Sequence, residues 1–142
     1  MDAEYYTPDV EDIHIGFECE INYPKGWIPI KVEDLYTDSD GYGNAYEVEH
    51  TIKNSPQDIR VLCLTKEQIE AEGWKVTQQM MYCEHIMSKD KNSLIYNSVN
   101  RELRLFKPIE DMGIELDYNK IVFDGSCKSI NEFRVIIKLL NL

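Results

Sequence analysis

An alternation of apolar and polar residues over positions 13–22 is the feature that most restricts how this chain folds. Every second residue is apolar from Ile13 through Phe17 to Ile21, and the residues between them are polar or Gly. Side chains along a β-strand point alternately to its two faces. The pattern therefore predicts a strand with one buried and one solvent-facing side, and it is the clearest strand signal in the sequence.

Shorter patterns of the same kind predict a sheet of several further strands. The signals are apolar runs, renewed alternation over 46–52, and the turn residues that separate these segments. The residues Asn97 to Asn100 predict a hairpin turn. The further strands are expected at residues 27–31, 46–52, 59–64, 74–87, 93–98, 101–106 and 118–126.

Two capping boxes mark helix starts. Thr65 and Gln68 form the first, and Gly73 ends that helix after about two turns, as Gly does just beyond a helix C-terminus. Ser129 and Glu132 form the second, which opens a C-terminal helix. This last helix carries one apolar stripe, made of Ile130, Phe133, Ile136, Ile137 and Leu140.

The length of 142 residues suits a single domain. Thr7-Pro8-Asp9 adds the start of a short helix, with Thr as the N-cap and Pro in the first helical position. The predicted fold is one α+β domain over residues 1–142. It is mainly an antiparallel β-sheet, with a packed C-terminal helix and one or two short helices.

The cysteines and the N-terminus predict a cytoplasmic protein. The four Cys contain no CxxC pair, and the acidic N-terminus lacks the apolar segment of a signal peptide. We therefore expect reduced thiols. No apolar run approaches the roughly 20 residues that cross a bilayer, so no membrane partner is expected.

The charge of the chain is concentrated in its first third. Residues 1–50 hold 13 Asp and Glu against two Lys, a net of −11, whereas residues 51–142 hold 13 acidic and 13 basic residues. A surface built from this acidic third of the chain would repel nucleic acid and attract cationic proteins. Basic residues do gather over 89–107, but acids interleave them and no aromatic platform accompanies them, so nucleic-acid binding is disfavoured.

The segment Asp38 to Glu49 resembles a calcium-binding loop in part. Counted from Asp38, acids stand at positions 1 and 3 (Asp40), Gly43 at position 6 and Glu49 at position 12. Tyr42 occupies position 5, where an oxygen ligand is needed, and no long helix is expected on either side. An acidic, Gly-rich hairpin loop is the favoured interpretation, with calcium as the alternative.

Cys83 and His85 would point to one face of a strand, where they could share a zinc ion. Structural zinc sites have close pairs of ligands, and no second pair is present. A buried thiol beside an imidazole is favoured, so no metal or cofactor is predicted.

The best grouping for acid–base chemistry is His14, Glu18 and Glu20 on one face of the first strand. His14 and Glu18 would lie about 13 Å apart along the strand, beyond hydrogen-bond reach. Glu18 and Glu20, about 7 Å apart, fit a solvated sheet face better than a catalytic pair. No nucleophile elbow, Walker A, GxGxxG or HExxH motif is present, which favours a protein that is not an enzyme.

Three segments give the chain a resemblance to a known group of proteins. They run from Tyr5 to Ile13 and on through Gly16 to Glu20, from Leu64 to Trp74, and from Ile130 to Arg134. Together they resemble small proteins encoded by bacterial phages and prophages. The resemblance implies a phage accessory gene product in the host cell. It assigns no activity and no functional residues.

We therefore expect a non-enzymatic accessory protein that binds a basic host or phage protein through its acidic N-terminal face, with a component of host defence as one such partner. The oligomeric state is left open. The expected contact residues are Glu18, Glu20, Tyr36, Asp38, Asp40, Tyr42 and Tyr46.

Two alternatives stay open. One is a pocket protein that sequesters or cleaves a small ligand such as a signalling nucleotide, and the other is a virion structural or cargo component. A deep pocket lined by two or more residues of one basic set would favour the first alternative. That set is Lys89, Arg101, Arg104 and Lys107.

Overall fold

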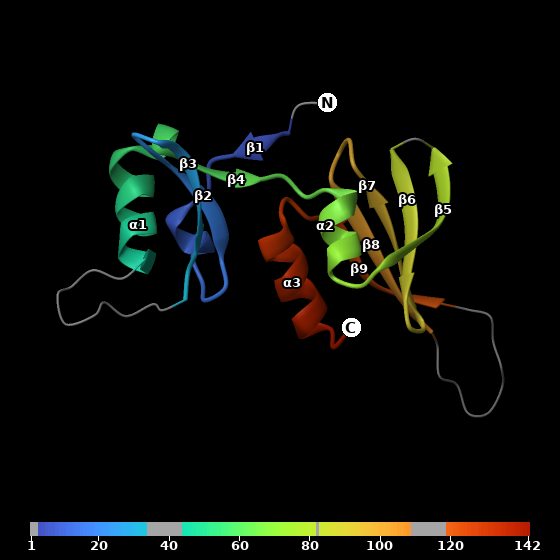
Figure 1. The fold of residues 1–142 in the computed structure, drawn as a ribbon. Helices are drawn as coiled ribbons and strands as arrows, with labels where there is room; N and C mark the ends of the chain where they lie inside the picture. Colours follow the sequence, from blue (N-terminus) through green and yellow to red (C-terminus); the bar gives the residue numbers. More distant parts are fainter. Residues whose placement is uncertain (1–2, 34–43, 82, 109–118) are drawn as a thin grey trace. The chain divides into compact units, whose positions relative to one another are not determined.

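The chain forms two compact units in a computed structural model that describes residues 3–33, 44–81, 83–108 and 119–142 (Figure 1). Unit 1 comprises Met1–Cys63 and unit 2 comprises Leu64–Leu142. Each contains an antiparallel sheet, at least one helix and its own hydrophobic core. The predicted α+β class, with a mainly antiparallel sheet and a C-terminal helix, is confirmed. The domain boundary of 1–142 stays a prediction.

Unit 1 is built on a four-stranded sheet with the strand order β1-β4-β2-β3. All of its strand pairs are antiparallel. Its described residues also form two 3-10 turns and one helix, α1. The elements are β1 (Tyr5–Tyr6), η1 (Val10–Asp12), β2 (Glu18–Tyr23), β3 (Gly26–Lys31), α1 (Asn44–Asn54), η2 (Pro56–Asp58) and β4 (Ile59–Leu62).

The early strand overlaps the predicted segment 13–22, but it begins later and ends one residue beyond it. Phe17 and Ile21 are buried, as the alternation requires, whereas Ile15 is 63% exposed. A turn precedes β2: Gly16 has a φ of +92°, and Phe17 N donates to His14 O at 3.0 Å. The turn places His14 before the strand, so the prediction that it shares the strand face with Glu18 and Glu20 is wrong.

The predicted strand over 46–52 is wrong, because this segment belongs to helix α1. Ala45 and Val48 are buried and Ile52 packs against the same core. These apolar residues are three and four positions apart, which is the spacing of one helix face. Val48 and Ile52 also fit a period of two, so the alternation was ambiguous.

The short helix expected at Thr7-Pro8-Asp9 begins two residues later than predicted. Asp9 is the N-cap of the 3-10 turn η1, and Pro8 precedes the cap instead of occupying the first helical position. The element is a single turn, Val10–Asp12, with no buried residue.

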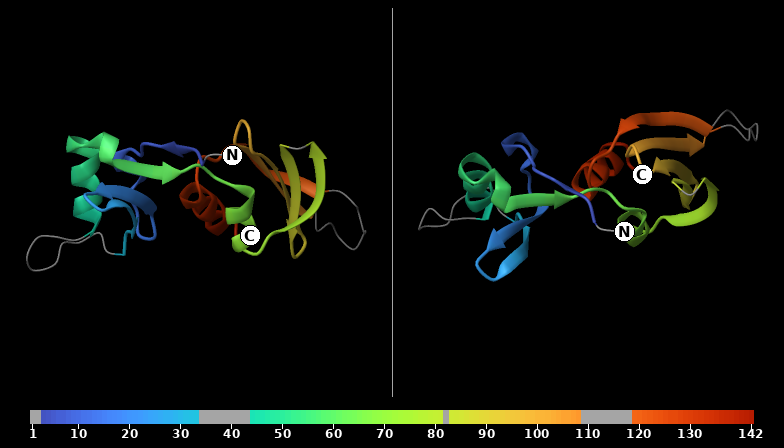
Figure 2. Two further views of the ribbon diagram at one scale, coloured as in Figure 1. Left: turned by 45° about the horizontal axis from the view of Figure 1, so that its top comes forward. Right: turned by 90° about the horizontal axis from the view of Figure 1, so that it is seen from above.

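Unit 2 is an antiparallel meander of five strands in chain order, β5-β6-β7-β8-β9. Helices α2 and α3 lie on the same side of this sheet, which curves around them (Figure 2). The elements are α2 (Lys66–Ala71), β5 (Lys75–Met81), β6 (Glu84–Lys89), β7 (Asn92–Asn97), β8 (Glu102–Pro108), β9 (Asn119–Ser126) and α3 (Ile130–Leu139).

The strand predicted over 74–87 is in fact two strands, β5 and β6, which pair with each other. Cys83 lies in the turn before β6. No Gly, Pro or Asn marks this turn, which is why the sequence patterns did not separate the two strands. The hairpin between β7 and β8 lies where it was predicted, and Asn97 Oδ1 accepts from Val99 N at 2.9 Å.

Both predicted N-caps are present. Thr65 Oγ1 accepts from Gln68 N, and Gln68 Oε1 accepts from Thr65 N, both at 3.1 Å. Ser129 Oγ accepts from Glu132 N at 3.4 Å, but the Glu132 carboxylate bonds to Lys128 N instead of completing the box. The predicted stripe of α3 packs against the core of unit 2, with Ile130 and Phe133 fully buried.

Candidate functional site

The face of the unit 1 sheet that points away from its core carries an arginine between two aromatic rings. The guanidinium of Arg60 lies 3.8 Å from the ring centroid of Tyr5 and 4.1 Å from that of Trp27. Arg60 Nε donates to Glu20 Oε1 at 2.7 Å. The register explains this cluster, because Glu20 lies directly opposite Arg60 in the β2–β4 pair and on the other face from Cys19 and Ile21.

This cluster suits recognition better than acid–base chemistry. Tyr, Trp and Arg are the residue types that dominate the energetics of protein interfaces. The carboxylate of Glu20 is already paired with Arg60, a permanent cation, and so serves to position that side chain. We call Tyr5, Glu20, Trp27 and Arg60 the Arg60 cluster.

The structure describes three of the seven predicted contact residues. Glu18 and Glu20 lie on the face of β2 that carries the Arg60 cluster, and Glu18 stands opposite Lys31. Tyr46 lies on α1, which packs on the other face of the sheet, and its ring stacks on His50 at 5.8 Å. The four remaining residues, Tyr36, Asp38, Asp40 and Tyr42, lie outside the described residues.

The described residues do not complete the ligand set of either metal site considered above, the calcium loop or the zinc pair. Glu49 lies on α1, where it pairs with Lys53 Nζ at 2.7 Å, and residues 38–43 are outside the described part of the chain. His85 is buried on β6, whereas Cys83 lies in the preceding turn. The part of the chain that the structure describes contains no group of three or more His, Cys, Asp or Glu placed to hold a metal ion.

The buried thiols of Cys19 and Cys127 are poor nucleophiles. All four Cys are free, and all but Cys83 are buried. Burial, reinforced by nearby Glu20 and Glu47, raises the pKa of Cys19 to about 12. Burial likewise raises the pKa of Cys127 to about 12. Thiols held in the protonated form do not act as nucleophiles at neutral pH.

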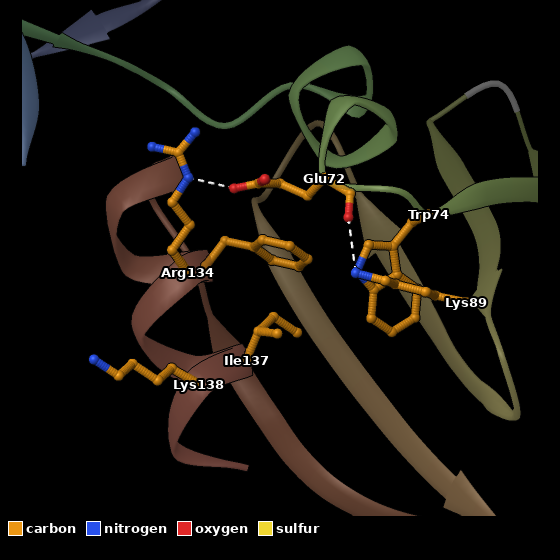
Figure 3. Close-up of a pocket in the computed structure, with 7 residues that line it drawn as sticks. Glu72, Trp74, Lys89, Arg134, Ile137 and Lys138 are labelled. Carbon is orange, nitrogen blue, oxygen red and sulfur yellow. Dashed lines mark hydrogen bonds and ion pairs between the residues drawn. The ribbon is translucent and has the colours of Figure 1, made fainter. Parts of the chain in front are cut away.

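Unit 2 contains a pocket of about 170 Å³ between α3, the end of α2 and the sheet (Figure 3). Lys89 Nζ donates to the backbone oxygen of Glu72 at 3.0 Å, while the Glu72 carboxylate accepts from Arg134 Nε. Trp74 and Phe133 meet edge to face, with ring centroids 6.3 Å apart. We call this the Trp74 pocket. Its lining residues are Glu72, Trp74, Lys89, Phe133, Arg134, Ile137 and Lys138.

The sequence patterns did not reveal this pocket. Of the four basic residues proposed for a ligand site, only Lys89 lines it, and its other cations, Arg134 and Lys138, come from α3. One feature of the sequence could have indicated the pocket. On α3, the apolar residues 133 and 137 and the basic residues 134 and 138 share one side of the helix.

Comparison with known protein families, curated proteins and solved structures finds no match to this chain. The resemblance to phage-encoded proteins therefore stays a prediction. Among the described residues, no helix is long and apolar enough to cross a membrane.

Proposed function

We propose that the protein is a non-enzymatic binding protein whose unit 1 binds a basic protein. The supporting observation is that the charge divides where the structure divides. Unit 1 holds 14 acidic residues against four basic ones, a net of −10, whereas unit 2 holds 12 against 11, a net of −1. A small unit with this net charge creates a negative potential that steers cationic partners toward it.

Exposed carboxylates supply this potential close to a structured turn. Asp9, Glu11 and Asp12 are all exposed in and beside η1, within four consecutive positions. Because acidic residues outnumber basic ones by ten in this unit, ion pairs such as those of Glu20 and Glu49 cannot neutralise its net charge. The negative charge mainly sets the association rate and the choice of partner.

The Arg60 cluster would supply the packing that charge alone does not. Surface ion pairs contribute little affinity, whereas well-packed Tyr, Trp and Arg side chains contribute much of it. Tyr5 is 36% exposed, and the Arg60 side chain is 28% exposed. In this proposal a partner contacts the cluster and is oriented by the surrounding acids. A phage accessory role, with a basic host or phage protein as the partner, extends the same proposal.

The test removes the charge without disturbing the Arg60 cluster. We expect a triple variant, Asp9→Asn, Glu11→Gln and Asp12→Asn, to fold normally, because exposed substitutions change stability by about 0.5 kcal/mol or less. Affinity capture from host lysate, followed by binding measurements on the purified partner, should show a strongly reduced association rate. Binding by the unchanged protein should weaken as salt is raised.

The matched control removes three exposed acids from unit 2, with Glu67→Gln, Asp90→Asn and Glu102→Gln. This control should bind as the unchanged protein does. Equal losses in both triple variants would show that total charge matters and not the acidic unit. Binding that is insensitive to salt and to the unit 1 substitutions would contradict the proposal.

A further inference from the structure

The Trp74 pocket combines an apolar wall with an excess of positive charge. Trp74, Phe133 and Ile137 supply the apolar part, and Trp74 and Phe133 belong to the buried core, so the wall is rigid. Three cations and one carboxylate line the pocket. The carboxylate of Glu72 is neutralised by Arg134 (Figure 3). The remaining charge therefore favours an anionic ligand.

Among the cations that line the pocket, Lys89 is the one whose position best suits the binding of an anion. An ammonium group has three N–H donors, and one of them bonds to Glu72 O at 3.0 Å, which fixes the side chain at the end of α2. The other two N–H groups of Lys89 have no acceptor among the described residues. Gly73 allows this approach, because a Cβ at that position would lie 3.3 Å from Lys89 Cε.

The indole N–H of Trp74 is a further donor without a partner. Its Nε1 is buried and has no hydrogen-bond partner among the described residues. Buried donors are nearly always paired with protein, water or ligand. Water or a ligand is therefore needed to satisfy this N–H.

The size and donor set of the pocket restrict the ligand further. A cavity of about 150 Å³ accommodates benzene, so a pocket of about 170 Å³ accommodates a single ring. A phosphate dianion requires several converging donors, often a bidentate Arg, but here Arg134 Nε already bonds to Glu72. A monoanion with an apolar body fits this chemistry better.

We propose that the Trp74 pocket binds a small monocarboxylate that carries one ring or a branched aliphatic group. The carboxylate accepts hydrogen bonds from Lys89 Nζ, and the apolar group packs against Trp74, Phe133 and Ile137. This site lies in unit 2 and is independent of the basic-protein binding proposed for unit 1.

The test is a titration of the full chain with phenylacetate, followed by NMR. A ligand of about ten heavy atoms reaches millimolar affinity at ordinary ligand efficiency. We expect shifts at the indole N–H of Trp74 and the methyl groups of Ile137, while the indole N–H of Trp27 in unit 1 stays unchanged as an internal control. Phenylacetamide, which has the same shape without the charge, should bind about tenfold more weakly.

Two variants test whether the carboxylate of the ligand binds to Lys89. Lys89→Met keeps the aliphatic stem and should weaken phenylacetate binding about tenfold, whereas Lys91→Met, in the turn between β6 and β7, should leave it unchanged. If Lys89→Met fails to fold, the affinities of phenylacetate and phenylacetamide for the unchanged protein still show whether the pocket recognises the negative charge.

Four outcomes would overturn the inference. They are the absence of shifts in the millimolar range, equal binding of phenylacetate and phenylacetamide, equal or tighter binding of inorganic phosphate at the same residues, and unchanged affinity in a folded Lys89→Met variant. Much tighter binding of a short peptide that ends in Phe with a free carboxylate would replace the small ligand with a peptide partner.

Discussion

Arg60 is held by neighbours on three other strands of the unit 1 sheet. An exposed ion pair alone contributes about 0–1 kcal/mol, and each aromatic contact of a guanidinium adds roughly 0.5–1 kcal/mol. The Tyr5 and Trp27 rings also keep the guanidinium in the orientation that Glu20 needs. Substituting Glu20 would therefore disturb packing as well as charge, and for this reason the charge variants proposed above leave it intact.

His85 is a buried, uncharged imidazole in the core of unit 2. It is 6% exposed, and its Nδ1 has no hydrogen-bond partner among the described residues. Burial, together with the nearby charge of Lys66, lowers the pKa of His85 below its ordinary value of 6.5, while Glu67 and Glu70 partly oppose this effect. In the folded state the neutral form is therefore favoured.

We predict that this histidine makes the protein less stable in mild acid. Because the pKa is lower in the folded state than in the unfolded state, the unfolded state takes up a proton first as the pH falls. The stability contributed by neutral His85 is fully present above about pH 6.5 and is lost as the pH falls through the folded pKa. Urea unfolding at about pH 7 and about pH 5 measures the loss.

The comparison protein for this prediction is His85→Leu, which has a similar volume and does not titrate. Its unfolding free energy should fall less than that of the unchanged protein over the same pH interval. Carboxylates titrate in both proteins, so the difference between them isolates His85. Identical pH dependence in the two proteins would show that His85 is not buried in its neutral form.

Among the elements, α1 and α2 show when local signals are sufficient. The capping box of α2 was predicted correctly because both of its hydrogen bonds join residues three apart in the sequence. At the start of α1, Asn44 and Glu47 also stand three apart, but Val48 and Ile52 fit the period of a strand as well as that of a helix. The packing of Ala45 and Val48 into the core of unit 1 stabilises the helix relative to a strand.

The last helix carries the strongest stability prediction at this scale. Phe133 is 1% exposed and contacts Trp74 edge to face. Phe133→Ala should lower the unfolding free energy by roughly 3–5 kcal/mol, through lost burial and the cavity left behind. Val135 lies on the same helix and is 40% exposed, so Val135→Ala should cost about 0.5 kcal/mol or less. Similar values for both variants in urea unfolding would contradict the packing described for α3.

On the scale of the whole molecule, the charge boundary and the structural boundary nearly coincide. Residues 1–50 carry the whole net charge of the chain, and the first compact unit ends at Cys63. The distribution of charged residues along the chain therefore locates the acidic part, but it does not show that this part is a separate compact unit. Hydrophobic patterns do not show which buried residues share a core, because this depends on contacts between distant segments.

We predict that unit 2 folds when it is produced alone as residues 64–142. It has its own core, and Leu64 N donates to Lys128 O at 2.8 Å, which joins its first residue to the segment before α3. A segment with its own core can fold independently. Trp74 is the only Trp in this fragment, so its fluorescence should report a single cooperative transition in urea. A gradual change without a transition would show that unit 2 depends on unit 1 and would support one domain over 1–142.

Features that arise from neighbouring residues can be read from the amino-acid sequence alone. These are the buried alternation from Phe17 to Ile21, the two helix N-caps, the β7–β8 hairpin and the location of the negative charge. The helix over 46–52 depends instead on packing in the folded protein. The same holds for the position of Arg60 between Tyr5 and Trp27 and for the contact of Lys89 with Glu72 beside α3. The physical reason is that caps and turns are completed by hydrogen bonds within a few residues, whereas the two candidate sites consist of side chains from several elements that meet only through strand register and core packing.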